Sequence, residues 1–223
     1  MVPVAEINLL RALPGAKRNI TAREDGKNPE VVAEACKFGE MYFDGPRDYG
    51  YGGYSYDGRW RPVARDIIEH FQLTPGMRVL DVGCAKGFLV HDLMLEAPGL
   101  EVFGLDISDY ALRHCQPETA GRLHLGSADD LPFPDDSFDC VLSINTIHNF
   151  DRDGAKRALV ELERVVRGNG RAFVQVDAYR TPEQKALFES WVLTARFHDY
   201  PEAWLQLFEE AGYTGDWYWT ILE

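Results

Sequence analysis

Hydrophobic residues follow two alternating patterns from residue 61 to the end of the chain. Short runs are apolar at nearly every position, and the segments between them are apolar at every third or fourth position. The first pattern predicts buried strands, and the second predicts amphipathic helices. We expect strands at 77–82, 101–106, 122–126, 138–144, 171–177 and 216–222, and helices at 62–71, 88–96, 108–115, 153–167, 182–197 and 201–211.

This order of elements predicts an α/β fold. Strands that alternate with helices are typical of a doubly wound, mostly parallel sheet that is covered by helices on both faces. The segment 168–170, Gly-Asn-Gly, is expected to end the helix that precedes it. We assign residues 62–223 to this single domain.

The first 61 residues do not continue the alternation. A helix is expected to begin at Asn28 and Pro29 and to run to about residue 38. The segment 41–60 contains five tyrosines and five glycines and has no clear period. We predict that residues 1–61 form an N-terminal arm with a Tyr/Gly-rich lid.

Composition narrows the choice of partners. The chain of 223 residues has 36 acidic and 23 basic residues and a formal charge of −13, which disfavours binding to nucleic acid. No apolar run approaches the roughly 20 residues that cross a bilayer, and no secretory signal is visible, so we expect a cytoplasmic protein without a membrane partner. The four cysteines form no CxxC pair, so we expect no metal site.

A turn with two glycines follows the first expected strand, in the run VLDVGCAKG at 79–87. Gly83 and Gly87 allow a sharp turn and a close approach of the backbone to a ligand, and the next helix points its amide groups at that ligand. The spacing excludes a phosphate-binding GxxxxGK[ST] loop. The run 79–87 also lacks the GxGxxG pattern of dinucleotide folds, which disfavours a nicotinamide-dependent reductase. The pattern that remains is DxGxxxG.

Acidic residues end or follow two later strands. Asp106 ends the second strand, where a carboxylate accepts hydrogen bonds from both hydroxyls of a ribose. Asp129 follows the third strand and is placed to accept from an adenine amino group. The alternative for Asp106 is a helix-capping aspartate, and Asp129 taken alone is an ordinary loop residue. Together with Asp81, Gly83 and Gly87 they favour an adenosine-containing ligand.

At these residues the chain resembles the class I S-adenosylmethionine-dependent methyltransferases, across about 62–223. VLDVGCAKG is similar to the family's first motif, GLDIS at 104–108 to its second, and the stretch 126–150 to the segment through the fourth strand of many small-molecule members. The resemblance implies S-adenosylmethionine as cofactor. It implies that Gly83 and Gly87 face the methionine part, Asp106 the ribose, Ile107 the adenine face, and Ala128 and Asp129 the adenine edge. The full set of expected cofactor-binding residues is Asp81, Gly83, Cys84, Ala85, Gly87, Asp106, Ile107, Ala128, Asp129 and Asn145.

The chain departs from the family pattern in two places. Ala85 stands where the family often has a glycine, and Lys86 follows it. Only one strand is expected after residue 211, where the family usually has a reversed two-strand hairpin. We therefore expect six strands, with the C-terminal strand reversed.

The loop after the fourth strand contains Asn145 and His148. A methyl group on a sulfonium is already activated, so the protein mainly aligns the acceptor and removes its proton. We predict that Asn145 and His148 are catalytic and that His148 is a general base or orients the acceptor, because histidine titrates near neutral pH. The alternative is a structural histidine that caps the next helix.

The arm and a later loop supply the expected acceptor site. The predicted substrate-binding residues are Tyr51, Tyr54, Tyr56, Arg59, Trp60 and His198, since aromatic rings stack on sugars or other rings and arginines pair with phosphates or carboxylates. Arg47 and Arg61 are further candidates for such pairing. The alternative is a loop that packs on the sheet through its aromatic residues.

These features predict an enzyme that methylates an oxygen of a small polar metabolite, such as a sugar, a sugar phosphate or a related anion. N-methylation and protein methylation are alternatives within the same chemistry. A non-catalytic S-adenosylmethionine-binding regulator is an alternative of another class. For the aromatic edge strand 217–219 there are two alternatives: it forms the contact of a homodimer, or it packs under the arm.

Overall fold

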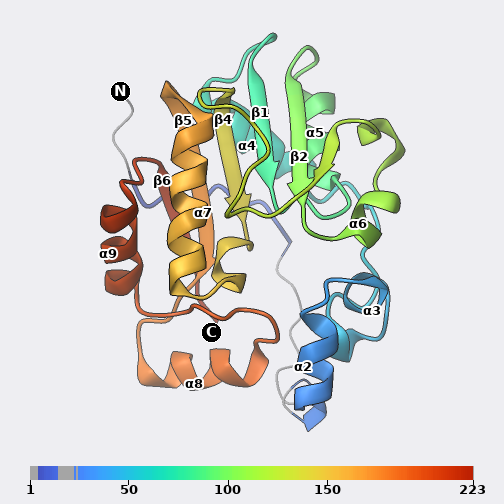
Figure 1. The fold of residues 1–223 in the computed structure, drawn as a ribbon. Coiled ribbons are helices and arrows are strands. Elements are labelled where there is room, and N and C mark those ends of the chain that lie inside the picture. The colour runs from blue at the N-terminus through green and yellow to red at the C-terminus, as the bar shows by residue number, and fades with distance from the viewer. Residues whose placement is uncertain (1–4, 15–22, 24, 223) are drawn as a thin grey trace.

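The computed structural model describes residues 5–14, 23 and 25–222, and they form one six-stranded sheet with the order β3-β2-β1-β4-β5-β6 (Figure 1). All neighbouring strands run parallel. The strands are β1 Arg78–Val82, β2 Glu101–Asp106, β3 Leu123–Leu125, β4 Phe138–Ile144, β5 Val166–Asp177 and β6 Asp216–Thr220. The predicted doubly wound α/β fold is confirmed.

The predicted reversal of the C-terminal strand is wrong. Phe173 pairs with Asp216 and Asp177 pairs with Thr220, so β6 runs parallel to β5. The physical reason lies in the connection between the two strands. It contains α8 Pro182–Trp191 and α9 Pro201–Ala211, which are long enough to return the chain to the starting end of the sheet, as a parallel crossover requires.

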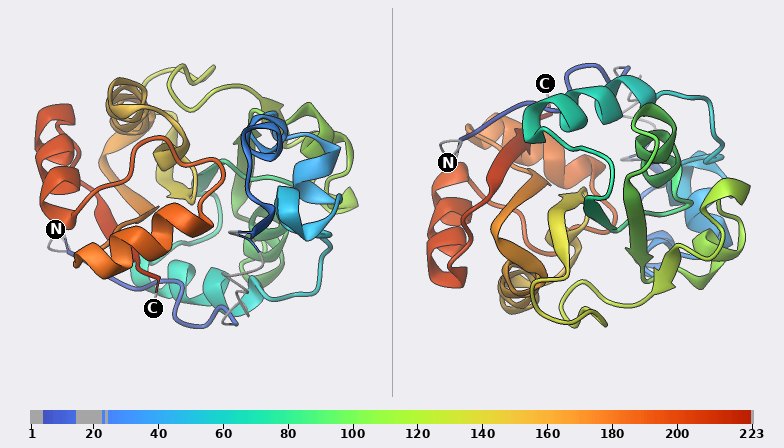
Figure 2. Two further views of the ribbon diagram at one scale, coloured as in Figure 1. Left: turned by 90° about the horizontal axis from the view of Figure 1, so that it is seen from below. Right: turned by 90° about the horizontal axis from the view of Figure 1, so that it is seen from above.

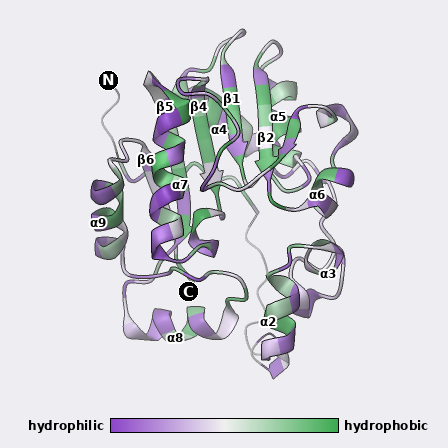
Figure 3. Ribbon diagram, viewed as in Figure 1, coloured by the Kyte–Doolittle hydropathy of each residue, from purple (hydrophilic) through white to green (hydrophobic). Residues whose placement is uncertain are grey.

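Helices cover both faces of the sheet (Figure 2). The faces are separated by the alternation within each strand: Val79 packs with the core around α4 Arg61–Phe71 and α5 Phe88–Glu96, whereas Leu80 and Val82 pack with the core around α7 Arg152–Val165 and α9. The remaining helices are α2 Pro29–Ala35, α3 Glu40–Phe43, α6 Asp109–Arg113 and the short turns η1 Arg47–Tyr49, η2 Pro117–Thr119 and η3 Ile147–Asn149. The central strands β2 and β4 are largely coloured as hydrophobic (Figure 3).

The boundary between α7 and β5 differs from the expected one. The glycine-containing segment 168–170 does not end a helix, because α7 ends at Val165 and β5 begins at Val166. The register of β4 and β5 shifts between Phe138 and Cys140, which marks an irregularity near the start of this strand pair. Glycine in a strand is typical of such an irregularity.

The two ends of the N-terminal segment lie in different places. Residues 5–7 run along the outer side of β6, where the Ile7 N–H donates to the Trp217 carbonyl at 2.8 Å and the Trp217 N–H donates to the Ala5 carbonyl at 3.2 Å. In contrast, α2 and α3 lie beyond the carboxyl ends of the strands, as α8 does (Figure 1). The division of the chain at residue 61 stays a prediction.

Candidate functional site

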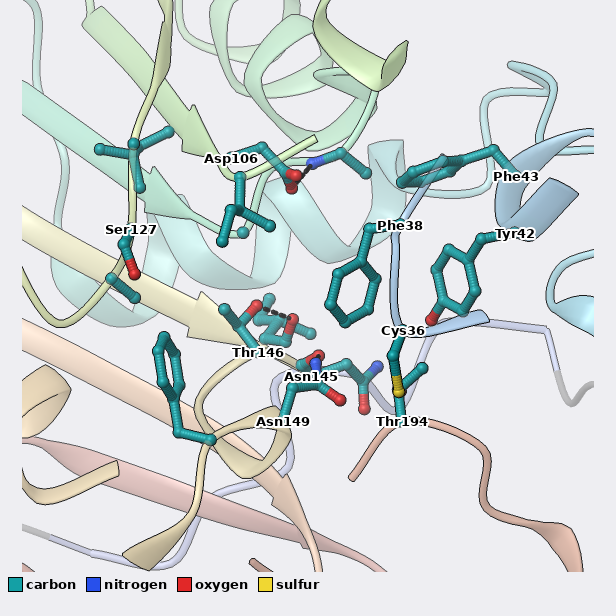
Figure 4. Close-up of a pocket in the computed structure, with 18 of the residues that line it drawn as sticks. Cys36, Phe38, Tyr42, Phe43, Asp106, Ser127, Asn145, Thr146, Asn149 and Thr194 are labelled. Atoms are coloured by element: carbon teal, nitrogen blue, oxygen red, sulfur yellow. Dashed lines mark hydrogen bonds between the residues drawn. The ribbon is translucent and has the colours of Figure 1, made fainter. Parts of the chain in front are cut away.

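A first cavity, of about 280 Å³, lies at the carboxyl ends of β1, β2 and β4 (Figure 4). This is the end of an open parallel sheet at which ligands bind. From the strand ends and the loops that follow them, the cavity is lined by Gly83, Ala85, Leu105, Asp106, Ile107, Gly126, Ser127, Ala128, Ile144, Asn145, Thr146, Asn149 and Phe150. From the other segments, it is lined by Cys36, Phe38, Tyr42, Phe43, Tyr51, Thr194 and Arg196. The N-terminal segment therefore forms one wall of this cavity.

The two glycines of the turn after β1 have different reasons to be glycine. Gly83 has a φ of 85°, and a Cβ atom there would lie 1.9 Å from Oγ1 of Thr146. Gly87 has a φ of 72° and begins α5, and its Cβ would lie 2.9 Å from Oγ1 of Thr119. Gly83 thus lets the turn approach the β4 loop beside the cavity, whereas Gly87 serves the packing of the helix start.

Asp106 holds the turn in shape. Its Oδ2 accepts from the Ala85 N–H at 2.7 Å, and its Oδ1 accepts from the Ser108 N–H at 2.8 Å. Burial raises the pKa of the Asp106 carboxyl, while these backbone donors oppose that rise. Ala85 has a φ of 50°, a conformation that is unfavourable for a residue with a side chain.

Asp81 lies under the same turn at the end of β1 and is buried. Burial, together with the nearby charge of Asp106, raises the pKa of Asp81 to about 7. A buried carboxyl in this state is sensitive to any positive charge that a ligand brings near it.

The first cavity meets a second one at Asn145. The two cavities share the residues Tyr42, Tyr51, Asn145 and Thr194. Asn145 has a φ of 55°, and its N–H lies 2.9 Å from Oε1 and 3.1 Å from the carbonyl oxygen of Gln175, which holds this unusual conformation. Strained backbone of this kind is concentrated at functional sites.

The second cavity has a volume of about 500 Å³ and lies between the arm, the end of β5 and the segment after α8. Its charged and hydrogen-bonding side chains are Arg23, Tyr42, Arg47, Tyr51, Tyr54, Ser55, Arg59, Asn145, His148, Asp177 and Thr194. Apolar and aromatic side chains complete it, including Trp60, Phe88, Phe188 and Trp191. This combination suits a small polar ligand with an apolar body.

His148 is buried at the edge of the second cavity. Its Nδ1 accepts from the Asp177 N–H at 3.2 Å, so the neutral ring carries its proton on Nε2. Burial lowers the pKa of His148, although the Asp177 carboxylate, with an oxygen 3.5 Å from Nδ1, opposes this. Burial thus favours the neutral ring of His148, in which Nε2 carries the proton and is a hydrogen-bond donor.

An ion pair fastens the arm to the turn after β1. Lys86 Nζ lies 2.8 and 2.6 Å from the two carboxylate oxygens of Asp44 and donates to the Tyr54 carbonyl at 2.9 Å. Tyr110 donates its hydroxyl to the same carboxylate at 2.7 Å. The lysine beside Ala85, which departs from the family pattern, thus has a specific partner in the arm.

Known proteins resemble the central part of the chain. A family described as a methyltransferase domain matches residues 80–174. A demethylmenaquinone methyltransferase from Symbiobacterium thermophilum is 34% identical over 129 residues, which cover 54% of this chain and 50% of the relative. A fatty-acid O-methyltransferase from Mycolicibacterium smegmatis is 35% identical over 122 residues, which cover 52% of this chain and 43% of the relative. The chain thus spans half or less of the length of these curated relatives.

A solved structure supports the same grouping at the level of the fold. The YcgJ protein of Bacillus subtilis superimposes with a TM-score of 0.50 and 22% identity over 66% of each chain. Residues 80–174 match a methyltransferase domain, and over this part the chain resembles the class I S-adenosylmethionine-dependent methyltransferases. The resemblance that the sequence motifs indicate is confirmed.

The first cavity fits the cofactor of these methyltransferases, S-adenosylmethionine. Among the expected cofactor-binding residues, the cavity is lined by Gly83, Ala85, Asp106, Ile107, Ala128 and Asn145. Ile107 is 57% exposed, although it is a large apolar residue, which suits a side chain that covers a flat ring such as adenine. The aromatic rings of Phe38 and Tyr42 close the cavity from the arm (Figure 4).

Four expected cofactor residues do not line this cavity. Gly87 and Asp81 lie behind the turn, as described above. Cys84 is buried against Gly104, where a Cβ would lie 2.6 Å from the sulfur, so its role is packing. Asp129 pairs with Arg157 at 3.0 Å and accepts from the Ser127 hydroxyl, which leaves Ser127 and Ala128 at the cavity wall.

Some of the expected acceptor residues line the second cavity and others do not. Tyr51, Tyr54, Arg59 and Trp60 line the second cavity. Tyr56 instead donates its hydroxyl to Asp92 at 2.6 Å. His198 packs between the rings of Tyr179 and Phe188, outside both cavities.

Several lining residues have no signal in the sequence. Arg23, Trp191 and Thr194 reach the cavities only because the arm and the segment after α8 fold toward each other. The described residues contain no group of three or more His, Cys, Asp or Glu side chains arranged to hold a metal ion. Within the same part of the chain, no helix is both long and apolar enough to span a membrane.

Proposed function

We propose that the chain is a methyltransferase that binds S-adenosylmethionine in the first cavity and a small polar acceptor in the second. The observation that carries this proposal is the junction of the two cavities at Tyr42, Tyr51, Asn145 and Thr194. A ligand in each cavity meets the other at this junction. That arrangement brings two reactants together in one orientation, which is a major source of rate enhancement.

The cofactor supplies a methyl group on a positively charged sulfur. The chain's own residues then align the acceptor and exclude water. Asn145 lies at the junction, and the rings of Tyr42 and Tyr51 cover it from the arm. We assign His148 the task of orienting the acceptor through Nε2, because its Nδ1 already accepts from the Asp177 N–H. The Asp177 carboxylate, which lines the same cavity, is the candidate to take up the acceptor's proton.

The preferred reaction is O-methylation of a sugar, a sugar phosphate or a related anion. The arginines and tyrosines of the second cavity support a polar, negatively charged acceptor. Relatives include proteins named for O-methylation and others named for C-methylation, so the preference for oxygen rests on the polar lining of the second cavity. N-methylation and methylation of a protein remain the alternatives, and the arm's cover over the cavity disfavours a large acceptor.

The direct test is to incubate the protein with labelled S-adenosylmethionine and a metabolite extract and to identify the methylated product by mass. Transfer to a small anionic metabolite is the expected result. Transfer only to protein would refute the proposed acceptor class. Calorimetry with S-adenosylhomocysteine and with NADH separates a methyltransferase from a nicotinamide-dependent reductase, since a methyltransferase binds the first ligand and not the second. S-adenosylhomocysteine binding without any methylated product would favour a regulator.

A further inference from the structure

Two arginines stack on one tryptophan in the wall of the second cavity. The guanidinium carbon of Arg23 lies 4.6 Å from the ring centre of Trp191, and that of Arg47 lies 5.6 Å from it. All three side chains line the cavity. The indole ring thus holds two positive groups close together.

Both guanidinium groups are anchored by neutral partners. Arg23 donates to the carbonyls of Asp48 at 3.3 Å and Gly50 at 3.0 Å, and Arg47 donates to the carbonyls of Gly50 at 3.0 Å and Tyr51 at 2.8 Å. A guanidinium has more N–H groups than these bonds use. These bonds set the orientation of each side chain and leave donors for a ligand.

Among the residues that the structure describes, this pair differs from other arginines near the arm in its salt bridges. Arg59 pairs with Asp57 at 2.6 Å and Arg61 pairs with Glu96 at 2.7 Å. Within the described part of the chain, neither Arg23 nor Arg47 forms a salt bridge with an acidic side chain. Arg59 and Arg61, both candidates for anion binding from the sequence, are therefore already neutralised.

The pair is electrostatically unfavourable without a counter-charge. Arg23 is only 6% exposed, and burial together with the charge of Arg47 lowers its pKa, although the nearby Asp48 carboxylate opposes this. An anion between the two groups would reverse this penalty. The chain carries a net charge of −13, so two adjacent guanidinium groups that form no salt bridge among the described residues are a local feature of this cavity and not of the protein in general.

We propose that Arg23, Arg47 and Trp191 form an oxyanion subsite that binds a carboxylate or phosphate group of the methyl acceptor. This inference rests on the proposed function, because it assigns two parts of the second cavity to two parts of the proposed acceptor. The subsite holds the anionic group, and the junction at Asn145 and His148 holds the atom that receives the methyl group. A suitable acceptor therefore carries an anionic group at one position and a nucleophile at another.

The test uses three probes of similar shape and different charge. Phenyl phosphate, benzoate and neutral benzamide are titrated into the protein by calorimetry, with and without S-adenosylhomocysteine. The expected result is measurable binding of at least one oxyanion and at least tenfold weaker binding of benzamide. Preference for phenyl phosphate identifies a phosphate acceptor, and preference for benzoate identifies a carboxylate acceptor.

Variants then locate the binding. Arg47→Met is expected to weaken binding of the preferred oxyanion at least tenfold, and Arg47→Lys is expected to fall between this variant and the original chain. Arg47 is exposed and does not hold the core, so these variants are expected to fold. Arg113→Met is the matched control, because Arg113 is 73% exposed in its side chain and pairs with Asp109 outside the cavity.

The possible outcomes distinguish failure of the subsite from failure of the proposed function. Equal oxyanion binding by the original chain and Arg47→Met, or binding of no oxyanion at all, overturns the subsite. Loss of binding in Arg113→Met to the same degree also overturns it, because the effect would then be one of net charge. Failure to bind S-adenosylhomocysteine with intact oxyanion binding refutes the proposed function and leaves the anion site in place.

Discussion

Lys86 Nζ lies 2.6 Å from Oδ2 of Asp44, and this contact joins the turn after β1 to the arm that covers it. The two partners differ in burial: the side chain of Lys86 is 8% exposed, and that of Asp44 is 30% exposed. The same pair thus connects one wall of the first cavity to the lid of the second. The consequences of breaking it depend on which partner is lost.

We expect Asp44→Asn to be more destabilising than Lys86→Met. The first change leaves a buried ammonium without its counter-charge, which costs about 3 kcal/mol, whereas the second leaves a carboxylate that water reaches. Urea unfolding measures the difference. S-adenosylhomocysteine affinity is expected to fall in both variants because the arm is released. Equal stability of the two variants would show that the pair behaves as an ordinary surface salt bridge.

Gly83→Ala is expected to weaken S-adenosylhomocysteine binding at least tenfold. The added Cβ would lie 1.9 Å from Oγ1 of Thr146, so the turn or the β4 loop must move. Gly121→Ala is the matched control, because Gly121 also has a positive φ, of 82°, but an added methyl group there would meet no atom of another segment within 4 Å. The control is expected to lose about 1 kcal/mol of stability from backbone strain and to keep its affinity.

Ala85→Gly is expected to leave the protein as stable as before or to stabilise it by up to about 1 kcal/mol. Ala85 has a positive φ of 50°, which glycine adopts without strain. Ala186→Gly in the exposed part of α8 is the control, and it is expected to cost about 1 kcal/mol. Thermal unfolding of both variants checks this. Equal destabilisation by the two changes would contradict the strain at Ala85.

The affinity for the cationic cofactor is expected to increase as the pH rises from 6 to 8. Asp81 has a pKa of about 7, so it is mostly neutral at pH 6 and mostly charged at pH 8, and a negative charge near the cavity favours a cation. Calorimetry with S-adenosylmethionine across this range measures the effect. In Asp81→Asn the slope is expected to disappear.

For the stability of the ligand-free protein, the raised pKa of Asp81 predicts the opposite trend with pH. Because the pKa of Asp81 is raised above its unfolded value, the folded state binds the proton more tightly. Its contribution to stability is therefore greatest at low pH and is lost as the pH rises from about 4 to 7. Asp81→Asn is expected to reduce this fall, which urea unfolding at several pH values will show.

His148→Gln is expected to retain at least one tenth of the methyl-transfer rate on the acceptor that the extract experiment identifies. Glutamine keeps a hydrogen-bond donor, and the Nε2–H of His148 is the donor that remains when Nδ1 accepts from the Asp177 N–H. His148→Leu, which has no donor, is expected to lose more. A loss of 100-fold or greater in His148→Gln, with a changed pH profile, would instead support a general base.

Local patterns account for most of the fold. The bounds of α5, β2, β4 and α9 agree with the predicted ones because the apolar residues that each element buries lie within its own sequence. The prediction for the direction of β6 is wrong because that direction depends on how the two preceding helices return the chain, which no period within 216–222 records. Of the cofactor residues that the sequence motifs identify, six line the first cavity. The other four lie behind its wall or pair with other side chains.

The acceptor side is less predictable for the same reason. The sequence predicts that tyrosines of the arm bind the acceptor, but their hydrogen-bond partners decide which of them face the cavity. Tyr56 turns to the buried Asp92, whereas Tyr51 and Tyr54 stay at the wall. Arg23 and Trp191 lie far apart in the chain, and neither has a local pattern that marks it.

The pairing of residues 5–7 with Trp217 also has a practical meaning for anyone who handles this protein. An exposed edge strand invites association with other chains, and the aromatic β6 would be such an edge without this cover. A dimer that adds strand to strand at β6 must first displace residues 5–7. Removal of residues 5–7 is therefore expected to expose the β6 edge and to make the protein prone to aggregation.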